Sequence, residues 1–150
     1  MLIVVAIVVL LAGITYPALA GGINSLRLNT AARTVASFAN LSVSRAERFQ
    51  DTVELIISAK DNSLEARAVK GAFQEKIQLG PDVRIAKILP DDGLGAEDAQ
   101  VRTFMVYPGG APPSFGVELE NRDAHRRKVV LDPITGAPTI TAVQAPPPGS

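Results

Sequence analysis

The sequence contains no cysteine, no tryptophan and only one histidine. Without cysteine, a disulfide framework, a thiol nucleophile and a cysteine zinc site are all excluded. Aromatic residues make up only 5% of the chain, so few side chains are available to stack on the bases of single-stranded nucleic acids or on sugars. Neither sign of charge is in excess, because Lys+Arg and Asp+Glu both number 15, and this balance argues against bulk nucleic-acid binding.

Apolar residues are concentrated at the N-terminus. A chain of 150 residues suggests one modest domain plus an attached segment. Residues 1–20 read MLIVVAIVVLLAGITYPALA, and no charged side chain occurs before Arg27. Because a helix rises about 1.5 Å per residue, roughly 20 apolar residues cover the ~30 Å hydrocarbon core of a bilayer. The sequence therefore predicts that residues 1–22 form the transmembrane half of a helix.

Two other interpretations of this segment compete with an anchor that stays on the protein. Residues 18–20 (ALA) resemble the cleavage site of a secretory signal peptide, but no Lys or Arg precedes the apolar run, which is also long for a signal. A buried core helix is disfavoured, because the remaining chain is too small to enclose a helix that is apolar on every side.

Residues 23–50 continue with helical periodicity and are predicted to form the amphipathic half of the same helix. Most charged side chains, such as Arg33 and Glu47, fall off the apolar stripe. Pro17 is expected to kink the helix. The stripe is predicted to contain Leu26, Ala31, Val35, Phe38, Ala39, Ser42 and Ala46.

From Asp51 onward the apolar period changes from 3.6 to 2, which predicts a β-domain over residues 51–143. A helix followed by a run of strands indicates an α+β fold, with the helix packed on one face of an antiparallel β-sheet. Residues 144–150, which are rich in proline, are predicted to be a disordered tail. Strands are predicted at 52–59 and 64–69, which form a hairpin, and at 73–79, 83–89, 101–107, 115–120, 127–131 and 139–143.

This order of features resembles the type IV pilin superfamily. Residues 2–18 (LIVVAIVVLLAGITYPA) are similar to the N-terminal consensus ELxxVVAIxxxLAAIAxPA, and Pro17 occupies the place of its kinking proline. The segment 32–36 (ARTVA) and the hairpin 52–69 resemble the H-type pseudopilins and the FimT-like minor pilins. So does the C-terminal pattern, in which YPGG at 107–110 and a strand precede RRKVVLDPITG at 126–136.

The resemblance implies a minor pseudopilin, a structural subunit near the tip of a type II secretion pseudopilus that takes part in protein export. Such a subunit lies in the bacterial inner membrane as a single-pass protein, with its C-terminal domain in the periplasm. The implied partners are other pseudopilins, the inner-membrane secretion platform and the lipid bilayer; no enzymatic activity, cofactor or metal is expected. The helix residues expected to pack in the membrane and filament are Leu2, Ile3, Val4, Val5, Ile7, Leu10, Leu11 and Pro17.

The sequence departs from the family pattern at its start. Prepilins carry a short basic leader, a Gly–Phe junction cut by prepilin peptidase and a glutamate soon afterwards, and this sequence has none of them. Alignment on Pro17 places Met1 just after the position of that glutamate. We therefore expect the true start to lie upstream, because processing, N-methylation and assembly would otherwise be in doubt.

A basic cluster near the C-terminus suggests an alternative function. FimT-like minor type IV pilins bind DNA through basic C-terminal regions, so a role in pilus assembly or DNA uptake is the second hypothesis. We disfavour it because Glu118, Glu120 and Asp123 are interleaved with the basic residues, and a solvated strand edge is the simpler interpretation. His125 is expected to be a solvated turn residue. The contact patch would consist of Arg122, Arg126, Arg127 and Lys128.

An acidic loop precedes the strand predicted at 101–107. Some pseudopilins bind Ca²⁺, but this loop lacks the regular ligand spacing of a dedicated calcium loop, so no metal site is predicted. Its carboxylates are Asp91, Asp92, Glu97 and Asp98.

Overall fold

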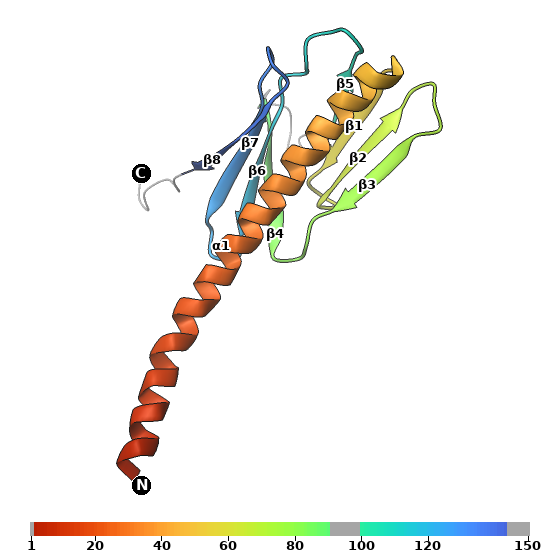
Figure 1. Cartoon of the computed structure of the whole chain (residues 1–150). Helices are drawn as coiled ribbons and strands as arrows, with labels where there is room; N and C mark the ends of the chain where they lie inside the picture. The colour runs from red at the N-terminus through yellow and green to blue at the C-terminus, as the bar shows by residue number, and fades with distance from the viewer. Residues whose placement is uncertain (1, 91–99, 144–150) are drawn as a thin grey trace.

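A computed structural model describes residues 2–90 and 100–143, with the side chains of residues 2 and 11–21 left out. The first element is a single helix, α1 (Leu2–Phe49), of 48 residues. Its N-terminal part projects away from the rest of the molecule, and its C-terminal part lies against the strands (Figure 1). The long helix predicted from the sequence is therefore confirmed, whereas the kink at Pro17 stays a prediction.

The predicted membrane anchor falls largely on the helix residues whose side chains are not described. Among the side chains that the structure does describe, no helical stretch is both long and apolar enough to cross a bilayer. The predicted tail, residues 144–150, also lies outside the described residues.

Eight strands follow the helix in the described part of the chain. They form two four-stranded antiparallel sheets, one in the order β3-β2-β1-β5 and the other in the order β4-β6-β7-β8. The strands are β1 (Val53–Ser58), β2 (Ser63–Ala68), β3 (Gln74–Gln78), β4 (Val83–Leu89), β5 (Val101–Val106), β6 (Gly116–Asn121), β7 (Arg126–Leu131) and β8 (Pro138–Val143).

The prediction of one sheet was wrong, although both ends of every predicted strand lie within one residue of the observed ends. Strand β5 returns to pair with β1, so that Val53 lies opposite Val106, and β4 pairs with β6 instead of joining the first sheet. Alternation along a strand reveals which side chains are buried, but it carries no information on which distant strand will be the neighbour. The predicted hairpin of β1 and β2 is confirmed, and in the second sheet β6 pairs with β7 and β8 lies at the edge.

Helix α1 contacts strands of both sheets and closes one core with them. Five of the seven predicted stripe residues are buried, Ala31 is half-buried, and Leu26 is 66% exposed, so its prediction was wrong. Leu28 and Ala32, at 2% and 0% exposure, were missed. The buried positions 28, 32, 35, 39, 42 and 46 alternate steps of four and three, which keeps a single face of the helix on the sheets.

Candidate functional site

The projecting end of α1 presents apolar side chains to its surroundings. Among the residues predicted to pack in a membrane or filament, five are described, and all five are exposed. An apolar surface of this extent is typical of a segment that is covered by lipid or by other helices. The exposed fractions are 76% for Ile3, 61% for Val4, 59% for Val5, 53% for Ile7 and 68% for Leu10; the side chains of Leu2, Leu11 and Pro17 are outside the described set.

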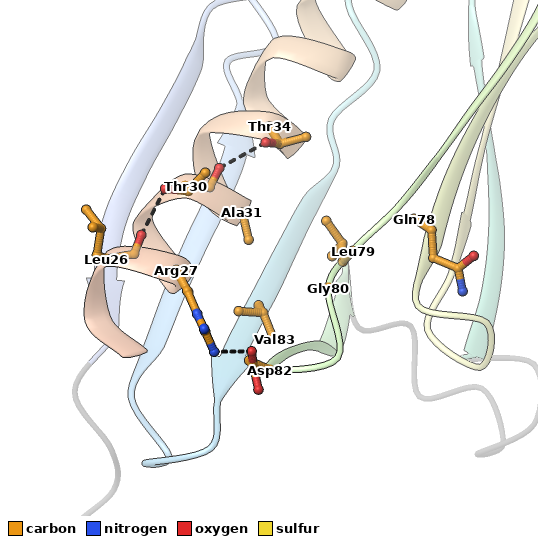
Figure 2. Close-up of a pocket in the computed structure, with 10 residues that line it drawn as sticks. All are labelled: Leu26, Arg27, Thr30, Ala31, Thr34, Gln78, Leu79, Gly80, Asp82 and Val83. Atoms are coloured by element: carbon orange, nitrogen blue, oxygen red, sulfur yellow. Dashed lines mark hydrogen bonds and ion pairs between the residues drawn. The ribbon is translucent and has the colours of Figure 1, made fainter. Parts of the chain in front are cut away.

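A groove runs along one flank of α1, between the helix and the segment that connects β3 to β4. Its first part is a cavity of about 420 Å³, lined on the helix by Leu26 and Thr30 and on the other side by Leu79 and Val83 (Figure 2). The hydroxyl of Thr30 donates to the carbonyl oxygen of Leu26 at 3.0 Å, so this polar group is satisfied within the helix. The groove surface is consequently mostly apolar.

The groove continues along the helix toward its C-terminal end. A second cavity of about 510 Å³ shares Thr30 and Thr34 with the first and extends to Leu41. Its other wall is formed by Glu75 and Ile77 of β3, the edge strand of the first sheet. The exposed Leu26, which the sequence analysis placed in the core, therefore belongs to this surface groove.

Charged side chains gather at the end of the groove nearest the projecting helix. Arg27 of α1 forms an ion pair with Asp82, and Arg122 Nε lies 3.0 Å from the other oxygen of the same carboxylate. Glu120 is paired in the same way with Arg84 and with Arg126, whose Nε lies 2.6 Å from Glu120 Oε2. Each carboxylate thus holds two guanidinium groups.

Glu120 has a pKa below its ordinary value. Its hydrogen bond from Arg84 lowers its pKa below the ordinary value of 4.5, and although burial acts in the opposite direction, Arg126 adds to the lowering. The side chain is only 8% exposed. A charged carboxylate at this depth is stable because its two arginines compensate for the lost hydration.

The predicted basic patch is divided by the strand that carries it. Along β7, side chains alternate between the two faces of the sheet, so Arg127 lies on the face of the buried Val129, and Arg126 and Lys128 lie on the opposite face. Arg122 is in the turn before β7 and points into the ion pair with Asp82. The four residues therefore do not form one continuous basic surface: the sheet separates Arg127 from the others, and Arg122 and Arg126 are each engaged by a carboxylate.

His125 is exposed in the turn between β6 and β7, as predicted, and its backbone N–H donates to Asn121 Oδ1 at 2.9 Å. The acidic loop with Asp91, Asp92, Glu97 and Asp98 lies outside the described residues. Among the residues that are described, no group of three or more His, Asp or Glu side chains is arranged to hold a metal ion.

The groove and the paired arginines were not predicted from the sequence. Arg27 and Asp82 are 55 residues apart, and Arg84 and Glu120 are 36 residues apart. The only local signal was that charge begins at Arg27, directly after the apolar segment. Their partners could be found only from the fold.

Comparisons with known proteins bear on the fold. No protein-family model matches the sequence, and no curated protein sequence matches it. Among solved structures, the minor pseudopilin EpsH from the Type 2 Secretion System of Vibrio cholerae is similar, with a TM-score of 0.57 and 9% sequence identity. The similarity covers 77% of this chain and 97% of EpsH. The chain therefore has a pilin-like fold, with an N-terminal helix packed on two antiparallel sheets.

Proposed function

We propose that this chain is a structural subunit of a type II secretion pseudopilus, of the minor H type. The observation that carries the proposal is the apolar helix segment, exposed at Ile3, Val5 and Leu10, that projects from a domain with a pilin-like fold. The similarity to EpsH supports this assignment at the level of the fold. A subunit of this kind acts through its surfaces and needs no catalytic residue.

The exposed helix segment would serve two states of the subunit. In the inner membrane the apolar side chains lie in lipid, and the β-domain lies in the periplasm. In the filament the same side chains pack on the helices of other pseudopilins. Lipid and a neighbouring helix are similarly apolar, so the transfer requires little change in hydration and is decided by packing.

Cysteine crosslinking tests the helix contact directly. Because the chain has no cysteine, a cysteine introduced at Ile7 or Leu10 supplies its only thiol group. In cells whose other pseudopilins carry a cysteine introduced into their own N-terminal helices, we expect oxidation to join the two thiols and link these variants to those subunits. Asn40→Cys, on the exposed face of the domain half of α1, is the control and should remain uncrosslinked.

A deletion strain separates the two candidate functions. Loss of the chain should block release of the secreted cargo, and the wild-type chain should restore it, whereas Ile7→Arg should not. A deletion that leaves secretion intact but abolishes DNA uptake would overturn the proposal in favour of a FimT-like minor pilin.

A further inference from the structure

The arginine cluster, defined as Arg27, Arg84, Arg122 and Arg126, lies at a distinctive place in the fold. Arg27 is on α1, Arg84 is at the start of β4, and the other two flank the turn between β6 and β7. These segments meet at the end of the β-domain from which the N-terminal part of α1 projects (Figure 1). Asn24 Nδ2, one turn earlier on α1, donates to Asp123 of the same turn at 2.9 Å.

Two arginines of the cluster, Arg84 and Arg122, line a hollow of about 230 Å³ together with Pro81, Asp82, Glu120 and Asn121. The other two, Arg27 and Arg126, pair with the carboxylates of Asp82 and Glu120 on its wall. A water molecule occupies roughly 30 Å³, so the hollow has room for a group of several heavy atoms. Asp82 and Glu120 are mostly buried, at 20% and 8% exposure of their side chains. These two carboxylates hold the sides of the guanidinium groups that face the domain in place through the ion pairs.

The outer edges of the guanidinium groups remain open to solvent. The side chains of Arg84 and Arg122 are 72% and 68% exposed, and each ion pair engages only part of a group that carries five N–H donors. Four arginines face two carboxylates in these pairs, and Asp123, nearby, reduces the excess of positive charge without cancelling it.

A buried amide on the wall of the hollow adds an independent observation. Asn121 is 5% exposed, and its Oδ1 accepts hydrogen bonds from the N–H groups of Asp123 and His125. Its Nδ2 is buried and has no hydrogen-bond partner among the described residues. An unsatisfied buried donor is costly, and Asn121 lines the hollow, so an oxygen-rich ligand held there would reduce this cost.

We propose that the arginine cluster binds the phosphate group of an anionic lipid headgroup at the membrane surface. This inference rests on the proposed anchoring of α1 in the membrane. Arg27 follows residue 22, the end of the predicted transmembrane half, by five residues, which is about 7.5 Å along a helix, and the polar layer of a bilayer is about 5–8 Å thick on each side. The cluster therefore meets the headgroup layer once the apolar segment is in the hydrocarbon core.

Phosphate is the ligand that this chemistry favours. Guanidinium groups bind phosphate through paired N–H donors, and they lose less hydration than an ammonium group would. Duplex DNA carries the same chemistry but needs a long basic surface that is free to approach, and this end of the domain faces the bilayer. Each arginine near an anionic membrane surface contributes about 1 kcal/mol, so two arginine contacts correspond to a preference of roughly tenfold or more for an anionic over a zwitterionic lipid.

The test uses the full chain in a neutral maltoside detergent, with bound lipid counted by native mass spectrometry. We expect phosphatidylglycerol to bind roughly tenfold more than phosphatidylcholine at equal concentration, and this preference to disappear in Arg84→Gln/Arg122→Gln. The matched control is Arg33→Gln/Arg48→Gln, which removes two exposed charges from α1 away from the cluster and should keep the preference. Circular dichroism checks that each variant is folded, and Arg122→Gln alone, in an exposed turn, provides a milder variant.

Equal lipid preference in the wild type and in the cluster variants would overturn the inference. Displacement of phosphatidylglycerol by equimolar glycerol phosphate or inorganic phosphate would also overturn it, because the site would then bind a free phosphate. Binding of a short DNA duplex in preference to the lipid, if it depended on the same arginines, would overturn it as well. Carbonate-resistant association with phosphatidylcholine vesicles reports the anchor alone. A chain that stays in such vesicles but shows no headgroup preference therefore contradicts this inference and leaves the proposed function intact.

Discussion

Asn62 Nδ2 donates a hydrogen bond of 2.7 Å to the carbonyl oxygen of Val83, across the junction between the two sheets. The same amide accepts a bond of 2.9 Å from the N–H of Ile85 at its Oδ1. Asn62 lies in the turn between β1 and β2, whereas Val83 and Ile85 belong to β4 of the other sheet. The side chain thus pairs with β4 as a strand residue would, and it links sheets that share no backbone ladder.

The first prediction concerns this bridge. Asn62→Gly should lower the free energy of unfolding by about 1–3 kcal/mol, because both side-chain hydrogen bonds are lost and the groups on β4 lose their partners. Asn62 has a φ of 51°, a left-handed conformation that glycine adopts without strain, so glycine removes the bridge alone. Chemical denaturation measures the loss.

Asn62→Ala is the companion variant, because it loses the bridge and also strains the backbone at positive φ. We expect it to be less stable than Asn62→Gly. If Asn62→Gly were as stable as the wild type, the residue would be required only for its backbone conformation, and the linking role would be wrong.

The second prediction concerns acid stability. Arg84, above all, lowers the pKa of Glu120 below 4.5 in the folded protein. A pKa that is lower in the folded than in the unfolded state adds stability that is present above about pH 4.5 and is lost as the pH falls through the folded-state pKa. The wild type should therefore lose stability on acidification below pH 4.5 more steeply than Glu120→Gln.

The difference between the wild type and Glu120→Gln reports the contribution of Glu120 alone, because the other carboxyls are present in both proteins. Asp132 also has a lowered pKa, because the N–H groups of Thr135 and Ile134 donate to it, and it titrates in both proteins alike. Denaturant midpoints measured from neutral pH down to pH 3 provide the two curves. Parallel curves would show that Glu120 has the same pKa in the folded and unfolded states.

The third prediction concerns the close approach of α1 to the sheets. Ala32, Ala39 and Ala46 are at 0%, 1% and 0% exposure and are spaced seven residues apart, so the helix backbone lies near the strands along this line. Ala39→Leu should destabilise the protein by about 1–3 kcal/mol, because the added atoms have no space in a packed core. Asn40→Leu adds the same side chain on the exposed face and should change stability little. Thermal unfolding distinguishes the pair, and equal midpoints would contradict the close packing.

Local pattern was enough to predict the elements of this fold. The change of period at Asp51 separated α1 from the strands, and turn residues such as Asn62 marked the ends of β1 and β2. These signals depend on neighbours a few residues apart. The apolar segment that includes Ile3 and Leu10 was also identified from local pattern, and both side chains are exposed in the structure. Its role as a contact surface stays a prediction.

Features that depend on distant residues were not predictable. The helix pattern alone allowed either Leu26 or Leu28 to begin the buried face, and only the position of the strands selects Leu28. The return of β5 to β1 follows from chain connections, not from the composition of β5. The arginine pairs arise in the same way, since Asp82 receives Arg27 from one element and Arg122 from another.

The fourth prediction concerns the C-terminal end of α1, where Arg45 lies between two aromatic rings. Its guanidinium carbon is 4.0 Å from the ring centroid of Phe49 and 4.1 Å from that of Phe73, which immediately precedes β3. Because a cation is attracted to the face of an aromatic ring, Arg45 ties the β2–β3 hairpin to the helix. Arg45→Gln should destabilise the protein by about 0.5–1 kcal/mol for each contact.

A double-mutant cycle with Phe73→Leu measures the contact between Arg45 and the hairpin. We expect a coupling energy of about 0.5–1 kcal/mol, because each single substitution removes the same interaction. Arg48→Gln in place of Arg45→Gln is the control, since the Arg48 guanidinium carbon is 5.9 Å from the Phe49 ring and no ring contact joins it to Phe73 among the described residues. Additive effects of Arg45→Gln and Phe73→Leu would mean that the ring and the guanidinium stabilise the helix end independently, and the hairpin would then be held by its backbone hydrogen bonds and apolar contacts alone.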